Sequence, residues 1–443
     1  MGALLDSFGE SFATVRTSMS GLARELLPAR QAFMDALLAD GLPGPREEAW
    51  KYTPLRALER RAFAAADPVP PAIDASVLAG IPAPRLVFVN GRHVPAHSDL
   101  AGLPDGVVLE PLSRTLAEGE PRDVNFILRR YDQRSEVFAR ANAALADEGV
   151  VLRVDAGVQV DAPVHLVFVS TQQAGDRAWH LRHFVDVRNE ARLDLVEHQL
   201  GAADHGHLAN EVLQLHLGQH GVVRHARIQS DAARATRFAR TDAVLAREAR
   251  YQRFDLELGA ALGRNELNVR LEGDGARLTA NGVLLGDGRR HVDTRLGIEH
   301  IARDTACELV WRGIADGRSR VVFHGGIGIR AGADGTDASL SNKNLLLSAD
   351  AEIDTQPVLV IDADEVKAAH GATVGQLDPT ALFYLRSRGI PDAQARRLLT
   401  VAFCREPLLA LEDDGLGRFL LDRLDAALAA SLGTDPAVDG AQA

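Results

Sequence analysis

Cysteine is scarce in this chain, since Cys307 and Cys404 are the only two among 443 residues. So few thiols exclude a disulfide framework and a structural zinc site rich in cysteine. Aromatic residues are also scarce, at 5% of the chain. This scarcity argues against the stacking platforms that bind single-stranded nucleic acids, and against an aromatic-rich sandwich core.

Lysine is nearly absent, because Lys51, Lys343 and Lys367 are the only lysines among 49 basic residues. The arginines that make up the rest are spread along the whole chain. With 61 acidic residues the formal net charge is −12. Binding to nucleic acids requires clustered basic residues that face the phosphates. No nucleic-acid partner is therefore expected.

Long apolar runs are missing as well. No stretch of about 18 consecutive apolar residues occurs, so no membrane span is expected. Residues 1–6 lack the basic region and following apolar core of a secretory signal. We therefore expect a cytoplasmic protein without a membrane partner.

The N-terminal part of the chain has mainly helical periodicity. Apolar residues at helical spacing predict helices within 1–66 and over about 123–146. Short apolar runs over 86–110 predict a few strands between them. These features define an expected N-terminal helical region with short strands over 1–146.

From Gly149 onward the period changes to two. Leu267, Val269 and Leu271, for example, alternate with polar residues, which is typical of half-buried strands. We expect a β domain over 147–369 with many short strands and no helix. A sandwich, a jelly roll and a parallel β-helix would all protect the strand edges, and periodicity does not choose among them. The short, closely spaced segments fit an irregular β-helix at least as well as a sandwich.

A helical pattern returns near residue 378. Asp378 is a good N-cap, and Gly389 is a natural residue to follow a helix over 379–388. Two further helices, from about 391 and over about 417–431, and a disordered tail at 433–443 complete an expected C-terminal helical region over 370–443.

Six histidines between residues 198 and 225 form the first candidate site, a metal centre. No cysteine lies nearby, and no H-E-x-x-H pattern is present. We interpret them as polar residues on the solvent-facing sides of strands and turns. The six are His198, His205, His207, His216, His220 and His225.

Asp362, Asp364 and Glu365 form a second candidate site, because grouped carboxylates can act as general acid and base on a polysaccharide. They also directly follow a predicted strand over 358–361, and we favour the interpretation that they form a turn. The chain contains no Walker motif and no G-x-S-x-G motif, so neither ATP hydrolysis nor a serine nucleophile of that type is indicated.

His370 is the third candidate. It lies among small residues over 368–375, where the strands give way to helices. Small neighbours allow another backbone or another chain to approach closely. A histidine that merely closes the β domain by hydrogen bonding is the simpler interpretation from the residues alone.

Several long segments of this chain resemble the SufB/SufD family of iron–sulfur cluster assembly proteins, and within it the SufD type. The SufD type carries the sequence His-Gly-Ala-Thr-Val-Gly, which stands here at 370–375. At the position of the reactive cysteine of SufB, this chain has Asn342. The similar segments are 48–55, 138–168, 341–348, 354–357, 370–378 and 382–390.

The resemblance implies a fold, an assembly and a cargo. The implied fold is a right-handed parallel β-helix flanked by N- and C-terminal helical regions. The implied assembly is a scaffold that contains a SufB-like subunit and a SufC-like ABC ATPase, and a homodimer is an open alternative when SufB is absent. The implied cargo is a transient iron–sulfur cluster shared with SufB, with no cofactor bound stably by this chain alone. By this resemblance the chain is a scaffold subunit and not an enzyme.

The resemblance also implies roles for particular residues. His370 matches a cluster ligand at the SufB interface, where an imidazole can bind iron as the neutral base and release it on protonation. Independently of the resemblance, Trp50 and Tyr52 are expected to anchor the N-terminal helices by packing. The candidate interface residues are Asn342 and, in the C-terminal helical region that would dock SufC, Leu382, Phe383, Tyr384, Arg386 and Arg388. For Leu382 and Phe383, a place in the chain's own core, alone or together with a SufC contact, stays an open alternative.

Two other functions remain as alternatives. A β-helix enzyme acting on carbohydrates would use Asp362, Asp364 and Glu365, although the scarcity of aromatic residues argues against a groove that stacks sugars. A stand-alone metal-binding protein would use the histidines between residues 198 and 225. Neither alternative accounts for the segment 341–390.

Overall fold

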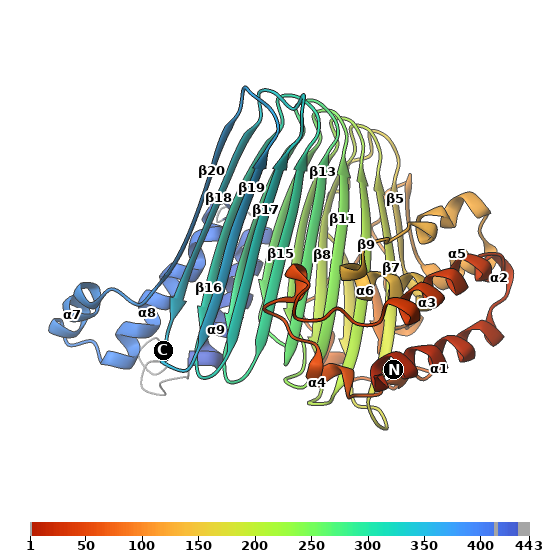
Figure 1. Cartoon of the computed structure of the whole chain (residues 1–443), viewed down its shortest axis with the longest axis horizontal. Coiled ribbons are helices and arrows are strands. Elements are labelled where there is room, and N and C mark those ends of the chain that lie inside the picture. Colours follow the sequence, from red (N-terminus) through yellow and green to blue (C-terminus); the bar gives the residue numbers. More distant parts are fainter. Residues whose placement is uncertain (1, 412–414, 433–443) are drawn as a thin grey trace.

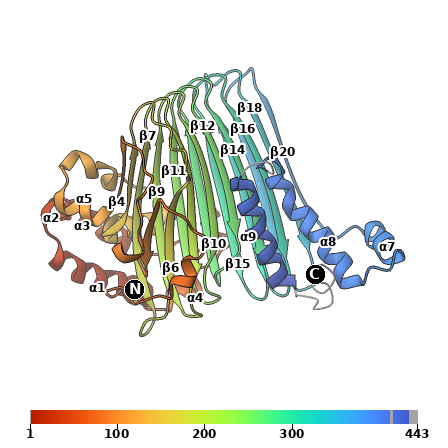
Figure 2. The same cartoon turned by 180° about the vertical axis from the view of Figure 1, so that it is seen from behind.

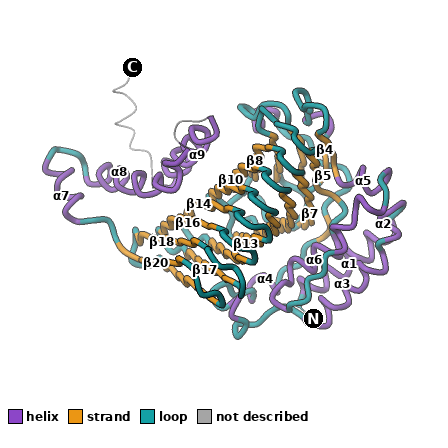
Figure 3. Tube along the Cα trace, turned by 90° about the horizontal axis from the view of Figure 1, so that it is seen from above, coloured by secondary structure: helices purple, strands orange, loops and turns teal. Residues whose placement is uncertain are grey.

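The computed structural model describes residues 2–411 and 415–432, so the predicted disordered tail at 433–443 lies outside the described residues. Its core is a parallel β-solenoid of about eight turns, in which successive strands alternate between two sheets (Figure 1). The parallel β-helix is therefore the correct one of the three predicted architectures. Viewed from above, the two sheets form stacked layers with helices outside both (Figure 3).

The first sheet, called sheet A here, has the strand order β19-β17-β15-β13-β11-β9-β7-β5-β4, with β1 paired to β7. Its strands are β1 (Ala64–Ala65), β4 (Val107–Pro111), β5 (Glu148–Val154), β7 (Arg177–Val187), β9 (His207–Leu217), β11 (Thr236–Leu245), β13 (Leu262–Leu271), β15 (His291–His300), β17 (Arg320–Ile329) and β19 (Glu352–Ile361).

The second sheet, sheet B, has the order β20-β18-β16-β14-β12-β10-β8-β6-β2-β3. Its strands are β2 (Arg85–Val89), β3 (Arg92–His93), β6 (Val164–Ser170), β8 (Arg192–Gly201), β10 (Val222–Ser230), β12 (Arg250–Glu257), β14 (Arg277–Gly286), β16 (Ala306–Ala315), β18 (Asp337–Leu346) and β20 (Lys367–Gly375).

The period of two in the sequence places one apolar row of each strand inside the solenoid. Leu267, Val269 and Leu271 of β13 are fully buried in the main hydrophobic core. Val269 lies in register with Ala243 of β11 and Ile298 of β15, so buried residues stack from turn to turn. Stacking of this kind buries apolar area continuously along the axis, which stabilises a solenoid.

Asp-Gly pairs mark tight turns between strands. Gly275 and Gly317 follow aspartates and have φ angles of 72° and 66°. A residue with a Cβ is strained in this region, whereas glycine adopts it readily.

The N-terminal helices pack on the outer face of sheet A, at the end where the solenoid begins (Figure 1). Trp50 is buried there, which confirms its predicted packing role. The helical elements of this region, of which η2 and η3 instead lie beside β2 of sheet B, are α1 (Ala3–Ser18), α2 (Gly21–Glu25), α3 (Leu27–Asp40), η1 (Glu48–Trp50), α4 (Arg56–Glu59), η2 (Ala75–Leu78), η3 (Pro95–His97), α5 (Leu112–Glu118), η4 (Pro121–Leu128), η5 (Arg134–Glu136) and α6 (Val137–Leu145).

The helix predicted over about 123–146 is divided. Only α6 is α-helical there, and η4 is a 3₁₀ helix separated from it by irregular chain. Tyr131, in the irregular part, is buried and donates its hydroxyl hydrogen to Asp242 of β11 at 3.3 Å. Arg140 donates to the Tyr131 carbonyl oxygen at 2.7 Å. These tertiary contacts outweigh the local helical preference.

The C-terminal helices cover part of the outer face of sheet B (Figure 2). Three helices occur close to the predicted ranges, and the Asp378 side chain caps the first by accepting from the Thr380 amide at 2.8 Å. β20 includes His370, and the division at residue 370 stays a prediction. The elements are α7 (Pro379–Ser387), α8 (Asp392–Arg405), η6 (Glu406–Leu411) and α9 (Gly415–Leu432).

Candidate functional site: the open end of the solenoid

The solenoid ends on two strands that are each paired on one side only. β19 pairs with β17, β20 pairs with β18, and in the described part of the chain neither has a second neighbour. Figure 1 shows these strands at the end of the solenoid opposite the N-terminal helices. Each free edge presents a row of unpaired backbone N–H and C=O groups.

The side chains at this end are incompletely buried. Ile353 and Leu359 of β19 and Ala368 of β20 pack against the main core but remain partly exposed. Val360 and Val374 are 49% and 43% exposed. An open edge flanked by exposed apolar side chains is a surface on which further strands can pair.

His370 lies on β20 at this open end. Its Cα is in register with that of Leu340, a core residue of β18, so its side chain belongs to the row that faces the solenoid axis. His370 is exposed and forms no hydrogen bond or ion pair with the rest of the described chain. Its neighbours in the same row, Ala368 and Ala372, are small. The imidazole is therefore free to bind a group brought to the open end.

Asn342 lies one layer behind the open end. Its Cα is in register with that of Ala372, and its side chain is fully buried. The Asn342 Oδ1 accepts hydrogen bonds from Thr355 Oγ1 at 2.7 Å and from Asn344 Nδ2 at 2.6 Å. The predicted contact between Asn342 and a partner stays a prediction.

The two thiols are both buried. Burial raises the pKa of Cys307 to about 12 and that of Cys404 to about 12. The thiolate is the form that binds metals and acts as a nucleophile. Both thiols are therefore protonated, and neither is exposed at the surface of the open end.

The predicted SufC-docking residues lie on and beside α7, which projects away from the solenoid (Figures 1 and 3). Phe383 and Tyr384 are 72% and 55% exposed, whereas Leu382 is half-buried. Arg386 forms an ion pair with Asp392 at 3.4 Å, and Arg388 lies 4.8 Å from the centre of the Tyr384 ring. An exposed aromatic pair with adjacent arginines is typical of protein interfaces.

Asp362, Asp364 and Glu365 lie on the turn that joins β19 to β20 and are exposed. The Glu365 carbonyl oxygen accepts from the Gly335 amide of the preceding turn at 2.7 Å. The interpretation of this segment as a turn is therefore confirmed.

The clustered histidines do not form a metal centre. Among the residues that the structure describes, no group of three or more His, Cys, Asp or Glu side chains is placed to hold an ion. His216 is exposed, as predicted, and so is His220. The interpretation as solvent-facing residues is wrong for the other four, which are buried: His198, His205, His207 and His225.

The buried histidines have two structural explanations. His198 is on the outer face of sheet B, but α9 covers it, and its ring lies 5.7 Å from that of Phe419. His225 faces the solenoid interior, where it hydrogen-bonds the carboxylate of Glu197 at 2.8 Å. Burial lowers the pKa of His198 to about 3 and also lowers the pKa of His225.

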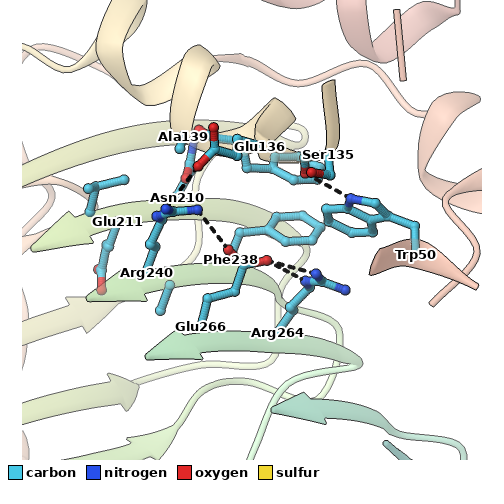
Figure 4. Close-up of a pocket in the computed structure, with 13 residues that line it drawn as sticks. Trp50, Ser135, Glu136, Ala139, Asn210, Glu211, Phe238, Arg240, Arg264 and Glu266 are labelled. Carbon is cyan, nitrogen blue, oxygen red and sulfur yellow. Dashed lines mark hydrogen bonds and ion pairs between the residues drawn. The ribbon is translucent and has the colours of Figure 1, made fainter. Parts of the chain in front are cut away.

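A segment around Trp50 connects the N-terminal region to sheet A (Figure 4). The Trp50 indole N–H donates to the Ser135 carbonyl oxygen at 2.8 Å, and the Arg264 guanidinium lies 3.8 Å from its ring centre. Glu266 forms ion pairs with Arg264 at 2.7 Å and with Arg240 at 3.3 Å.

The same segment extends across sheet A to its free edge. Thr53 donates to the Asp293 carboxylate of β15 at 2.6 Å, and Glu48 accepts from the Gln356 amide of β19 at 3.1 Å. Segment 48–55, which carries the resemblance, therefore braces the sheet up to the open end. The residues of this segment carry the family resemblance, but no local pattern in them indicates the contact with β19.

Comparison with known proteins decides the family. Residues 168–403 match the family described as SUF system FeS cluster assembly, SufBD core domain. Residues 4–166 match the SufBD protein N-terminal region. The chain belongs to the SufB/SufD family.

Individual members of the SufB/SufD family agree with this result. The chain is 32% identical to the iron–sulfur cluster assembly protein SufD of Escherichia coli, over 90% of this chain and 92% of that protein. It is 31% identical to a SufBD family protein of Synechocystis, over 86% and 87% of the two chains. A SufD of Bacillus subtilis is 25% identical, over 77% and 79%. Within the family the chain is most like SufD.

No helix among residues 2–411 and 415–432 is long and apolar enough to cross a lipid bilayer.

Proposed function

We propose that this chain is a non-enzymatic scaffold subunit for iron–sulfur cluster assembly, in the cytoplasm. It pairs through β19 and β20 with a SufB-like subunit, and the nascent cluster forms where the two solenoids meet. The observation that carries the proposal is the pair of free strand edges, with His370 on β20, in a chain whose relatives are named for iron–sulfur cluster assembly.

His370 supplies this chain's ligand to the cluster, which is cargo. A neutral imidazole binds iron, and protonation of the ring releases it. The exposed position, the small neighbours and the lack of a partner among the described residues support this role. Since both thiols are buried and protonated, the remaining ligands come from the SufB-like partner.

The C-terminal helices dock a SufC-like ABC ATPase. The support is the exposed aromatic and arginine surface of α7, at Phe383, Tyr384 and Arg388, on helices that extend from β20. If ATP hydrolysis moves these helices, it would also move β20 at the open end, because only a short connection joins β20 to α7.

Co-expression tests the proposal. The full chain carries an affinity tag and is produced with SufB-like and SufC-like proteins, and the captured material is sized by chromatography. We expect a stable complex that contains all three proteins. Recovery of this chain alone, with both other proteins soluble but unbound, would contradict the proposal.

The three lysines give an independent measurement. Lys367 begins β20 and Lys343 lies on β18, whereas Lys51 lies in the segment that braces sheet A. All three are exposed. Amine acetylation followed by mass spectrometry should label all three in the free chain. In the complex we expect Lys367 to be the most protected, because it lies on a strand that pairs with the partner.

A further inference from the structure

We infer that a buried hydrogen-bonded layer made by Asn342, Asn344 and Thr355 holds the two free strand edges at a fixed spacing. These are positioning residues, because they act on the proposed site through β19 and β20 and do not contact the cargo. The inference rests on the proposed function for its purpose, but its structural part is testable without a partner.

The layer connects both sheets across the interior. Thr355 of β19 donates through its Oγ1 to Asn342 Oδ1 of β18 at 2.7 Å. Asn344 of β18 donates through its Nδ2 to the same oxygen at 2.6 Å and to the Thr373 carbonyl oxygen of β20 at 3.0 Å. One connected set of side chains therefore links β18, β19 and β20.

The layer is well isolated from water. Asn342 is fully buried and Asn344 is 2% exposed, and Thr355 is half-buried at the end of the solenoid. Hydrogen bonds between buried polar groups are costly to leave unmade, so they hold their partners at short distances.

Apolar packing is incomplete at the same place. Ile353, Leu359 and Ala368 are inward apolar residues of β19 and β20, and they have no further turn above them and remain partly exposed. Each of the two strands also has backbone hydrogen bonds on one side only. Without the polar layer, the spacing between the strands would depend on incomplete packing. A partner solenoid must meet both edges at once, so a variable spacing would weaken the pairing.

The same interior column provides a matched control. Thr294 of β15 lies in register with Phe323 of β17, which lies in register with Thr355. Thr294 is fully buried, yet its Oγ1 has no hydrogen-bond partner among the described residues. Replacing threonine by valine keeps the shape and removes only the hydroxyl group. Thr294→Val therefore makes the same chemical change without breaking a hydrogen bond.

Hydrogen–deuterium exchange of the free full-length chain tests the inference. In Thr355→Val we expect amides of β19 and β20 to exchange roughly tenfold faster than in the wild type, because one buried hydrogen bond is lost. In Thr294→Val we expect their exchange to be unchanged. Unchanged exchange in Thr355→Val, or equal acceleration in both variants, would overturn the inference.

Binding to the SufB-like subunit provides the second measurement. Thr355→Val should bind roughly tenfold more weakly than the wild type, and Thr294→Val should bind normally. Faster exchange in Thr355→Val with unchanged affinity would overturn the positioning role. If the wild type itself fails to bind, the proposed pairing is wrong, and the exchange result still decides whether the layer fixes the strands.

Discussion

At the scale of single residues, position in the solenoid matters more than residue type. This chain has 15 histidines, but their surroundings differ widely. His370 is exposed at the end of the solenoid among small residues, whereas His180 of β7 is buried on the outer face of sheet A, beneath the N-terminal helices. The first is available to a ligand, and the second affects stability alone.

Replacing His370 should reduce cluster assembly without reducing partner binding. We expect His370→Ala to form the complex normally but to accumulate at least tenfold less iron and sulfide, because one cluster ligand is lost. Anaerobic reconstitution with ferrous iron and sulfide, followed by absorption spectroscopy and iron analysis of the complex, measures this. His216→Ala, which changes an exposed histidine away from the open end, is the control. Equal cluster content in both variants would contradict the role of His370.

His180 predicts how stability depends on pH. Burial lowers its pKa from 6.5 to about 3, so the unfolded chain binds a proton that the folded chain does not between these values. The unfolding free energy therefore falls as pH falls below 6.5, by about 2 kcal/mol at pH 5 from this residue. Between pH 7 and pH 5, the unfolding free energy of His180→Gln should therefore fall by about 2 kcal/mol less than that of the wild type, as measured by chemical denaturation.

The control is His220→Gln, which makes the same substitution at an exposed histidine. If the unfolding free energy of His180→Gln depends on pH as it does in the wild type, then His180 binds protons equally in the folded and unfolded states, and the prediction is wrong.

At the scale of elements, α7 contributes little to the core of its own chain. None of its residues is buried, and Phe383 is 72% exposed. In contrast, α9 packs Leu420, Leu424 and Leu428 against sheet B. A helix that contributes so little to the core of its own chain is suited to contact another protein.

A charge on α7 should prevent ATPase binding without unfolding the chain. We expect Phe383→Asp to weaken capture of the SufC-like protein more than tenfold, because it places a carboxylate in an apolar contact. The unfolding free energy should change by no more than about 0.5 kcal/mol, since the residue is exposed. Val69→Asp changes a residue that is 76% exposed in the N-terminal region and should leave capture intact. Equal capture by both variants would exclude α7 from the interface.

The elements also show how far the sequence could predict the structure. The strands and the three C-terminal helices follow from periodicity, caps and turn residues, all of which act within a few residues. The segment 123–146 could not be predicted in this way. Its irregular part depends on Tyr131, whose hydroxyl group reaches Asp242 on a strand that is more than 100 residues away in sequence.

At the scale of the whole molecule, the solenoid has two different ends. N-terminal helices pack beside the first turns, whereas the last turn ends on the free edges of β19 and β20 (Figures 1 and 2). Proteins usually protect strand edges, because an exposed edge pairs with other chains. An unprotected pair of edges at one end is expected to self-associate when no other partner is present.

The oligomeric state should therefore depend on the open end. In the absence of a SufB-like subunit, we expect the wild type to form a dimer and the double variant Val360→Lys, Val374→Lys to remain a monomer of 47.6 kDa. Lysines on an edge oppose strand pairing through charge and solvation. Light scattering coupled to size-exclusion chromatography measures the mass. The control Val108→Lys changes a valine on β4 that is 46% exposed and should still dimerise. A dimer of the double variant would place the contact elsewhere.

The sequence by itself determined where most strands and helices form, with 123–146 as the exception, and it determined the family through the long segments that resemble SufB and SufD. The positions of these elements depend on neighbours along the chain, and the family resemblance depends on residue identity alone. The resemblance implied the β architecture, but periodicity did not: partner residues such as Val269 and Ile298 pair 29 positions apart, and only tertiary structure decides that pairing. Tertiary structure also decided the surroundings of His198, Asn342 and Thr355, because a side chain's exposure depends on what packs over it. α9 covers His198, β20 covers Asn342, and nothing in the described chain lies beyond β19 and β20.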